Sequence, residues 1–386
     1  MADSKKTPAA ATPLMVEVAA QKLPEPDAAA ELFPVEPNPN PASDADYEAA
    51  MEALDFGVNF GDHMAVAEWD PEKGWHDQRV VAYGPLGLEP AASVLHYSQE
   101  IFEGMKAYRW ADGSIWTFRP GYNAARLNYS ARRMAMPEIP LDDFIGSLVQ
   151  VVRADERWVP SADNTSLYLR PFMIADEPFV GVRPAKHYKY VVIETPVGPY
   201  FKGGLAPVSI WVETDYNRAA PGGTGDAKTG GNYAASLLPQ LNASEKGYEQ
   251  VCYLDPATDT NLEELGGMNV FVVLKDGEVL TPKLTGSILE GGTRAAIIQL
   301  LEDKGVEVRE TTIPLQWLLE SIESGEVTEM FACGTAAVVV PIGRLGGKGF
   351  EVTIPGDKVT REILDELGGI QRGTVPDRHN WMYRLV

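Results

Sequence analysis

A lysine in a glycine-rich loop, Lys228, is the residue whose surroundings most suggest chemistry. Residues 221–236 read PGGTGDAKTGGNYAAS, and five of the ten residues from Gly222 to Gly231 are glycine. Because glycine has no side chain, a ligand can come close to backbone of this kind. Lys228 could be a solvated surface lysine, the lysine of a phosphate-binding loop, or a lysine that bonds covalently to a carbonyl cofactor.

The phosphate-loop interpretation is disfavoured by the residues on either side of Lys228. That motif needs a glycine directly before the lysine, where this chain has Ala227. It also needs a helix that starts just after the loop and holds the anion at its N-terminus. Gly230 and Gly231 occupy that place, and a glycine pair is a poor helix start. Nucleotide binding without a visible chromophore would support this alternative.

Blocks spread along the rest of the chain favour the covalent cofactor. They read FGVNFGDHMAVAEW (56–69), LHYSQEIFEGMKAY (95–108), FRPGYNAARLNYSARRM (118–134), TSLYLRPF (165–172), PVGPYFKGG (196–204), the lysine loop, EELGGMNVFVV (263–273) and FACGTAAVV (331–339). In these blocks and their order the chain resembles the branched-chain amino-acid aminotransferases, which are pyridoxal-phosphate enzymes of fold type IV. The resemblance implies reversible ping-pong transfer of the amino group of leucine, isoleucine or valine to 2-oxoglutarate, through a Schiff base on Lys228.

The resemblance assigns seven residues to pyridoxal 5'-phosphate. Lys228 is the expected catalytic residue, which moves a proton between the substrate Cα and the cofactor. Glu264 pairs with the pyridine nitrogen, and its charge favours the protonated ring. The phosphate is bound by a guanidinium and by main-chain N–H groups where a helix begins. The expected cofactor-binding residues are Arg126, Lys228, Tyr233, Glu264, Gly292, Thr293 and Thr335.

The resemblance also implies a pocket that accepts an apolar side chain and, in the other half-reaction, the second carboxylate of glutamate. A buried charge without a partner is costly, and the family combines an aromatic box with one arginine, here Arg170. Main-chain groups of Thr335 and Ala336 would bind the substrate α-carboxylate. The expected substrate-binding residues are Phe56, Tyr97, Phe102, Tyr168, Arg170, Val182, Tyr200, Gly267, Thr335 and Ala336. Each aromatic residue, taken alone, could equally be ordinary core packing.

Composition argues against several other kinds of partner. The net charge of −22 at pH 7 disfavours nucleic acid and anionic membranes. No uninterrupted apolar run reaches the length of about 18 residues that a membrane span needs. The two cysteines, Cys252 and Cys333, indicate neither a disulfide framework nor a zinc site. We expect a cytoplasmic protein with small-molecule substrates and no metal, and the family implies a homodimer in which residues 180–182 reach the partner's site.

The elements expected to position these residues form two domains. Residues 1–42 are rich in Ala and Pro, which predicts a disordered extension. Over 43–197, extended runs, the clearest from Tyr188, alternate with predicted helices, as in a smaller N-terminal α+β domain. One of these helices is capped by Ser43, and another carries Phe144 on its apolar face. Residues 198–207 are the expected interdomain loop, and 208–386 a larger C-terminal, cofactor-binding domain. The expected fold class is therefore α+β / α/β, the two-domain architecture of fold type IV, similar to D-amino-acid aminotransferase.

Other enzymes of the same fold type are the nearest alternatives. A D-amino-acid aminotransferase or a pyridoxal-phosphate lyase would have a pocket without the Tyr168-x-Arg170 pair. Gly267 stands where some relatives have threonine, so one pocket wall differs. Ala337 and Val340 stand where some relatives carry a C-x-x-C pair, so we expect no redox switch there. The preferred substrate and the direction of the reaction in the cell stay open.

Overall fold

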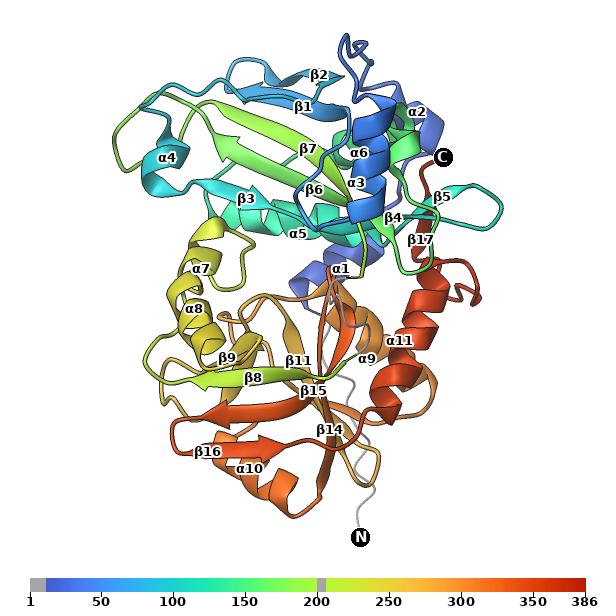
Figure 1. The fold of residues 1–386 in the computed structure, drawn as a ribbon. Coiled ribbons are helices and arrows are strands. Elements are labelled where there is room, and N and C mark those ends of the chain that lie inside the picture. Colours follow the sequence, from blue (N-terminus) through green and yellow to red (C-terminus); the bar gives the residue numbers. More distant parts are fainter. Residues whose placement is uncertain (1–11, 200–205) are drawn as a thin grey trace.

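Two β-sheets form the framework of the computed structural model, which describes residues 12–199 and 206–386 (Figure 1). The strands of the first sheet are β1 (His63–Asp70), β2 (Gly74–Ala82), β3 (Glu100–Phe102), β4 (Met105–Arg109), β5 (Ile115–Phe118), β6 (Ser166–Ala175), β7 (Tyr188–Val197) and β17 (Met382–Arg384). Their order is β17-β5-β4-β6-β7-β1-β2, with β3 beside β6. All pairings of this sheet are antiparallel, and the longest ladder joins β6 to β7, as the apolar run from Tyr188 led us to expect.

The alternation of side chains along β6 places two expected site residues on one face. Successive residues of a strand point to opposite faces of its sheet. We call the part of the molecule built on the first sheet the first unit, and the part built on the second sheet the second unit. Leu167 and Leu169 are fully buried in the apolar core of the first unit. Tyr168 and Arg170 therefore point to the opposite face, toward the second unit. The expected helix with Phe144 on its apolar face is α6, which covers the core face of this sheet.

The second sheet is sandwiched between two apolar cores. Its strands are β8 (Val208–Glu213), β9 (Gln250–Leu254), β10 (Leu262–Leu265), β11 (Asn269–Leu274), β12 (Val279–Pro282), β13 (Val308–Thr311), β14 (Val327–Gly334), β15 (Val338–Gly347) and β16 (Phe350–Thr353). Their order is β10-β9-β8-β15-β14-β11-β12-β13, with β16 beside β15. Along β11, Val270 and Val272 enter one core, whereas Phe271 and Val273 enter the other. Burial on both faces explains why this strand is a continuous apolar run.

The helices connect and cover the sheets. They are α1 (Pro13–Ala20), α2 (Pro26–Ala30), α3 (Asp44–Ala53), α4 (Ser93–Tyr97), α5 (Pro120–Arg133), α6 (Leu141–Ala154), the 3-10 turn Glu156–Trp158, α7 (Gly230–Ala234), α8 (Leu237–Glu245), α9 (Gly292–Asp303), α10 (Leu315–Glu323) and α11 (Lys358–Gln371). The expected cap at Ser43 is present, since its hydroxyl accepts the Asp46 N–H. Among the helices described, none has both the length and the apolar character to cross a membrane.

The prediction of a disordered extension is wrong for residues 12–42. Leu14 of α1 is buried against α5, and α1 lies between the two units in Figure 1. α2 packs on α6, and Phe33 after it is fully buried in the first core. Because the segment as a whole is rich in Ala and Pro, its composition did not predict that these few apolar side chains would be buried. They suffice because they pack against elements that the rest of the fold has already ordered.

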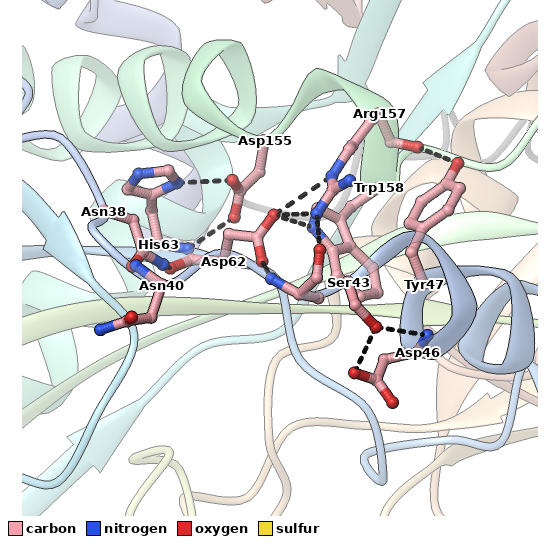
Figure 2. A network of polar contacts seen from close by, with 11 residues as sticks. Asn38, Asn40, Ser43, Asp46, Tyr47, Asp62, His63, Asp155, Arg157 and Trp158 are labelled. Carbon is pink, nitrogen blue, oxygen red and sulfur yellow. Dashed lines mark hydrogen bonds and ion pairs between the residues drawn. The ribbon is translucent and has the colours of Figure 1, made fainter.

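Polar contacts hold the last part of the same segment (Figure 2). The Asp62 carboxylate accepts hydrogen bonds from the Ala42 N–H at 2.7 Å and the Trp158 indole at 2.9 Å. It also forms an ion pair with Arg157 at 2.7 Å. Burial alone would raise the pKa of Asp62, but the bonds from Ala42, Trp158 and Arg157 hold it below its ordinary value. Residues before α3 are thus part of the folded first unit.

The C-terminal strand revises the expected domain boundaries. β7 ends at Val197 and β8 begins at Val208, so the two sheets are separated where we expected the interdomain loop. However, α11 leads from the second unit back to β17, which pairs with β5 in the first sheet (Figure 1). Leu385 is fully buried in the first core. The C-terminus therefore belongs to the first unit, a placement for which a three-residue strand carries no sequence signal.

Candidate active site

A cavity of about 470 Å³ brings together most of the expected site residues. Its lining includes Phe56, Phe102, Arg126, Tyr168, Arg170, Lys228, Tyr233, Glu264, Gly267, Gly292, Thr293, Thr335 and Ala336. These residues come from strands of both sheets, from the helices α5, α7 and α9, and from loops between these elements. A cavity of this size is typical of a site for a cofactor and a small substrate.

The loop that carries Lys228 is fixed on both sides of the lysine. The Lys228 N–H donates to the Ser130 hydroxyl of α5 at 2.9 Å, and the Lys228 carbonyl accepts the Phe102 N–H at 3.0 Å. The Nζ atom donates to the Tyr233 hydroxyl at 2.7 Å and lies 4.8 Å from the centre of the Phe102 ring. These contacts point the amine into the cavity rather than into solvent, in contrast to an ordinary surface lysine.

Contrary to the expectation from the glycine pair, a short helix, α7, does begin at Gly230. Its N-terminus is nevertheless closed to a phosphate, because the Glu100 carboxylate accepts the Gly230 N–H. A Cβ at Gly230 would lie 2.1 Å from the same carboxylate oxygen, so glycine is needed for this close approach. The phosphate-loop interpretation is therefore also contradicted by the carboxylate at this helix N-terminus, a contact that the sequence did not reveal.

Glu264, rather than its neighbour Glu263, faces the cavity. Its Oε1 atom makes both described contacts of the carboxylate. It accepts a hydrogen bond from the Leu289 N–H at 2.8 Å and forms an ion pair with Arg218 at 2.9 Å. Glu263 turns the other way and accepts the Ser287 hydroxyl at 2.5 Å, as strand alternation requires. Burial raises the pKa of Glu264 to about 7, although Arg218 and the Leu289 N–H act in the opposite direction.

Arg218 is a functional residue that the sequence analysis missed. Its side chain is buried, and it donates to the carbonyls of Ser287 at 3.0 Å and Gly225 at 3.3 Å, besides its ion pair with Glu264. It thus joins the carboxylate to the glycine-rich loop. One arginine before a loop carries no signal in a single sequence, because only the folded loop brings it to Glu264.

Arg126 lies beside the first turn of α9, as expected for a phosphate site. Its guanidinium forms a bidentate pair with Glu103, with Nε–Oε1 and Nη2–Oε2 distances of 2.8 and 2.7 Å. The third nitrogen donates to the Glu290 carbonyl at 3.0 Å. Gly292 and Thr293 begin α9, whose first N–H groups have no partner within the helix and attract anions.

The aromatic box and its arginine are assembled on one side of the cavity. Arg170 donates to the Tyr168 hydroxyl at 3.0 Å, and its guanidinium lies 4.8 Å from the centre of the Phe102 ring. Phe56 packs edge-on against Tyr168 with 4.9 Å between the ring centres. A Cβ at Gly104 would lie 2.0 Å from the Tyr168 oxygen, so glycine there makes room for the tyrosine. The wall is apolar except for one guanidinium and one hydroxyl.

Two expected substrate residues among those described do not line this cavity. Tyr97, at the end of α4, and Val182 are 38% and 92% exposed, and neither belongs to the lining. α4 is tied to the loop of Val182 by a bridge between Ala92 and Pro178, so both residues lie on one exposed rim. Tyr200 lies outside the described residues. A single chain does not bring Tyr97 to its own pocket, which corrects the expectation for that residue, whereas Val182 belongs to the segment 180–182 that we expected at the partner's site.

Comparisons with known proteins agree with this geometry. The family described as amino-transferase class IV matches residues 100–345. The chain belongs to this family. Its sequence is 51% identical to the branched-chain-amino-acid aminotransferase of Mycolicibacterium smegmatis, over 92% of this chain and 98% of that relative. It is 52% identical to the enzyme of the same name from Mycobacterium tuberculosis strain H37Rv, over 90% of this chain and 96% of that relative.

The fold of this class IV aminotransferase is also found in solved structures. The crystal structure of the branched-chain amino acid aminotransferase of Escherichia coli superposes with a TM-score of 0.69 at 28% sequence identity. The match covers 83% of this chain and 100% of that one. The expected family and the expected fold class, the two-domain architecture of fold type IV, are therefore confirmed.

Proposed function

We propose that this aminotransferase transfers the amino group of leucine, isoleucine or valine reversibly to 2-oxoglutarate, with pyridoxal 5'-phosphate bound at Lys228. The observation that carries the proposal is the Tyr168–Arg170 pair inside an otherwise apolar wall. An apolar wall suits a branched aliphatic side chain, and a single guanidinium suits the second carboxylate of glutamate. The names of the mycobacterial relatives, at 51% and 52% identity, support the same activity.

The residues present fit the cofactor at each of its polar groups. One cavity holds an amine on Lys228, a buried carboxylate on Glu264, and a helix N-terminus next to Arg126. When bound, pyridoxal 5'-phosphate supplies an aldehyde that captures amines and a ring that withdraws electrons from the substrate Cα. Two solved relatives are described as containing the PLP form and pyridoxamine 5'-phosphate, which supports the same cofactor here.

The protein's own groups then have distinct tasks. The Lys228 amine removes the proton from the substrate Cα and returns it, because it is the base that lines the cavity beside Tyr233. Glu264 provides the negative charge that stabilises a protonated ring nitrogen. The positive charge of that nitrogen would in turn favour the ionised form of the Glu264 carboxylate. Arg218 and the Leu289 N–H hold Oε1, so Oε2 would be the oxygen available to pair with the ring nitrogen of the bound cofactor.

We also propose that the protein is a cytoplasmic homodimer in which the rim of one chain completes the pocket of the other. Val182 is 92% exposed, and Val180, Leu95 and Tyr97 on the same rim are also exposed. Exposed apolar residues gathered in this way are typical of an interface. The two cysteines are free and buried, which is consistent with a reducing compartment.

A panel of amino donors and 2-oxo acids tests the activity directly. We expect turnover with L-leucine, L-isoleucine, L-valine and L-glutamate, and none with D-alanine. Turnover with D-alanine and none with L-leucine would replace this proposal by a D-amino-acid aminotransferase. Lys228→Ala should abolish both transamination and the near-ultraviolet to violet absorption of the bound cofactor, whereas Lys275→Ala, at an exposed position, should change neither.

A further inference from the structure

A second cavity, of about 30 Å³, adjoins the expected phosphate site. Three residues of that site, Arg126, Gly292 and Thr293, line both cavities, as does Thr335 of the turn expected to bind the substrate carboxylate. The smaller cavity is further lined by two basic side chains, Lys106 and Arg119, and no carboxylate belongs to its lining. The sequence analysis assigned neither of these basic residues a role.

The charge of Arg126 is already balanced inside the protein. Its partner Glu103 is fully buried, and the two form a bidentate pair with 2.7 and 2.8 Å contacts. Arg126 therefore offers hydrogen bonds in a fixed geometry, but the pair as a whole has no net charge. A phosphate ester carries between one and two negative charges at pH 7, and burying it without a counter-charge would be costly.

Lys106 is placed to supply such a charge. It is 8% exposed on β4, and its Nζ donates to the Ala336 carbonyl at 2.7 Å. An ammonium has three donors, so this bond leaves two. Burial first, and the nearby Arg372 second, lower the pKa of Lys106 to about 7. On the phosphate side, the groups around it are the guanidinium groups of Arg119 and Arg126 and the hydroxyls of Tyr108, Tyr122, Thr293 and Thr335. Lys106 also lines a larger cavity toward α11, where the charged residues are Arg361, Asp365 and Arg372.

Arg119 adds a second positive charge behind the first turn of α9. It donates to the Gly292 carbonyl at 3.1 Å and lies over the rings of Tyr122 and Trp381 at 4.7 and 5.2 Å. It adopts a left-handed backbone conformation, with φ of 50°, directly before α5. These contacts fix the guanidinium beside the helix terminus.

We infer that Lys106, supported by Arg119, is the net counter-charge for the cofactor phosphate, and that its bond to Ala336 couples the phosphate site to the turn expected to bind the substrate carboxylate. The inference rests on the proposed function, because the phosphate is that of pyridoxal 5'-phosphate. Since the amine gives up its proton readily in the free protein, arrival of a dianion should draw a proton onto it.

Calorimetry on the full chain freed of cofactor tests this inference, with inorganic phosphate as the probe. At pH 8, titration in two buffers with different ionisation heats measures the protons exchanged on binding. We expect the wild-type protein to take up most of one proton per site. Lys106→Met should abolish the uptake, and Lys106→Arg, which is charged at every accessible pH, should bind phosphate without it. An unchanged proton uptake in Lys106→Met would overturn the inference.

Affinities for pyridoxal 5'-phosphate and for pyridoxal, which lacks the phosphate, give the second readout. Lys106→Met should weaken binding of pyridoxal 5'-phosphate by about 10- to 100-fold, as expected for a charged hydrogen bond, and leave pyridoxal binding unchanged. Lys275→Met, at an exposed position, is the matched control. Equal losses for both compounds would mean that Lys106 only shapes the turn. If the wild-type protein bound no pyridoxal 5'-phosphate, the proposed function itself would fail.

Discussion

Arg170 and Tyr168, two residues apart on β6, are joined by a 3.0 Å hydrogen bond from the guanidinium to the phenol oxygen. The strand places both side chains on the face opposite Leu167 and Leu169, which are buried in the core. The ring of Phe102 lies beneath the guanidinium at 4.8 Å. The arginine is thus held by aromatic groups. The charge of Glu100 acts on it, but among the described residues no carboxylate forms an ion pair with it, and its buried Nε atom has no hydrogen-bond partner. It is therefore available to an acidic substrate.

Arg170→Met should separate the two half-reactions. Glutamate and 2-oxoglutarate would lose a charged hydrogen-bond partner, at a cost of about 2–3 kcal/mol or about 30- to 200-fold in kcat/KM. Leucine brings only apolar atoms to this wall and should lose much less. Single-turnover measurements with each donor isolate the effects, because each half-reaction needs one substrate. Equal losses for leucine and glutamate would show that Arg170 supports the whole pocket.

Glu264→Gln should retain the cofactor but slow proton transfer. Glutamine has a similar size, yet it lacks the charge that keeps a ring nitrogen protonated, and each pKa unit lost by that nitrogen corresponds to about 1.4 kcal/mol. We expect turnover to fall by at least about tenfold at saturating cofactor. Glu263→Gln is the matched control, since that carboxylate bonds Ser287 and Thr285 outside the cavity. Loss in the control and not in Glu264→Gln would reverse the assignment.

Removal of the N-terminal segment should destabilise the protein, although its composition first predicted the opposite. Phe33 is fully buried in the first core and Leu14 is 3% exposed against α5, the helix of Arg126. Phe33→Ala should cost about 3–5 kcal/mol and Leu14→Ala about 2–5 kcal/mol in free energy of unfolding. Urea denaturation measures both. The exposed Val16→Ala, in the same helix as Leu14, should change little. A chain that starts at Pro41 and unfolds at the wild-type urea concentration would refute this docking.

A buried acid far from the site should make stability depend on pH. Glu194 is fully buried, and a Cβ at Gly61 would lie 2.6 Å from Glu194 Oε1 and 2.5 Å from Asp155 Oδ2, so the two carboxyl groups flank this glycine. Burial, followed by the charges of Asp155 and Asp62, raises the pKa of Glu194 well above 4.5. Figure 2 shows both aspartates engaged in other contacts, with His63 and Arg157.

The direction of this pH dependence follows from the number of protons that the folded and the unfolded chain bind. Above pH 4.5 the unfolded chain releases the Glu194 proton before the folded chain does, so this group's contribution to stability falls as pH rises from 4.5 toward the raised pKa. Glu194→Gln cannot ionise, and it should therefore raise the melting temperature more at pH 8 than at pH 5. Thermal melts at the two pH values measure the difference. A shift that is the same at both values would show that Glu194 does not titrate in this range.

The sequence by itself determined the family and the local form of several elements, and it singled out Lys228 as the candidate cofactor lysine. The apolar run of β7, the amphipathic α6 and the cap at Ser43 follow from local periodicity and side-chain chemistry, which act over a few residues. The spacing E-x-G-x-M-N over residues 264–269, which matches the family, selects Glu264 over Glu263. These features depend on neighbours in the chain, and the resemblance of several separated blocks supplied the roles.

Only the tertiary structure decided which distant groups meet. The buried Arg218 reaches Glu264, Glu103 neutralises Arg126, and Lys106 bonds the carbonyl of Ala336, 230 residues away. No pattern in a single sequence encodes such pairs, because their energies arise from burial and from partners that folding brings together. The packing of the N-terminal segment also depends on partners that only folding brings together. Its few apolar residues look too sparse to order a chain, and they become sufficient once α5 and α6 offer them a preformed surface.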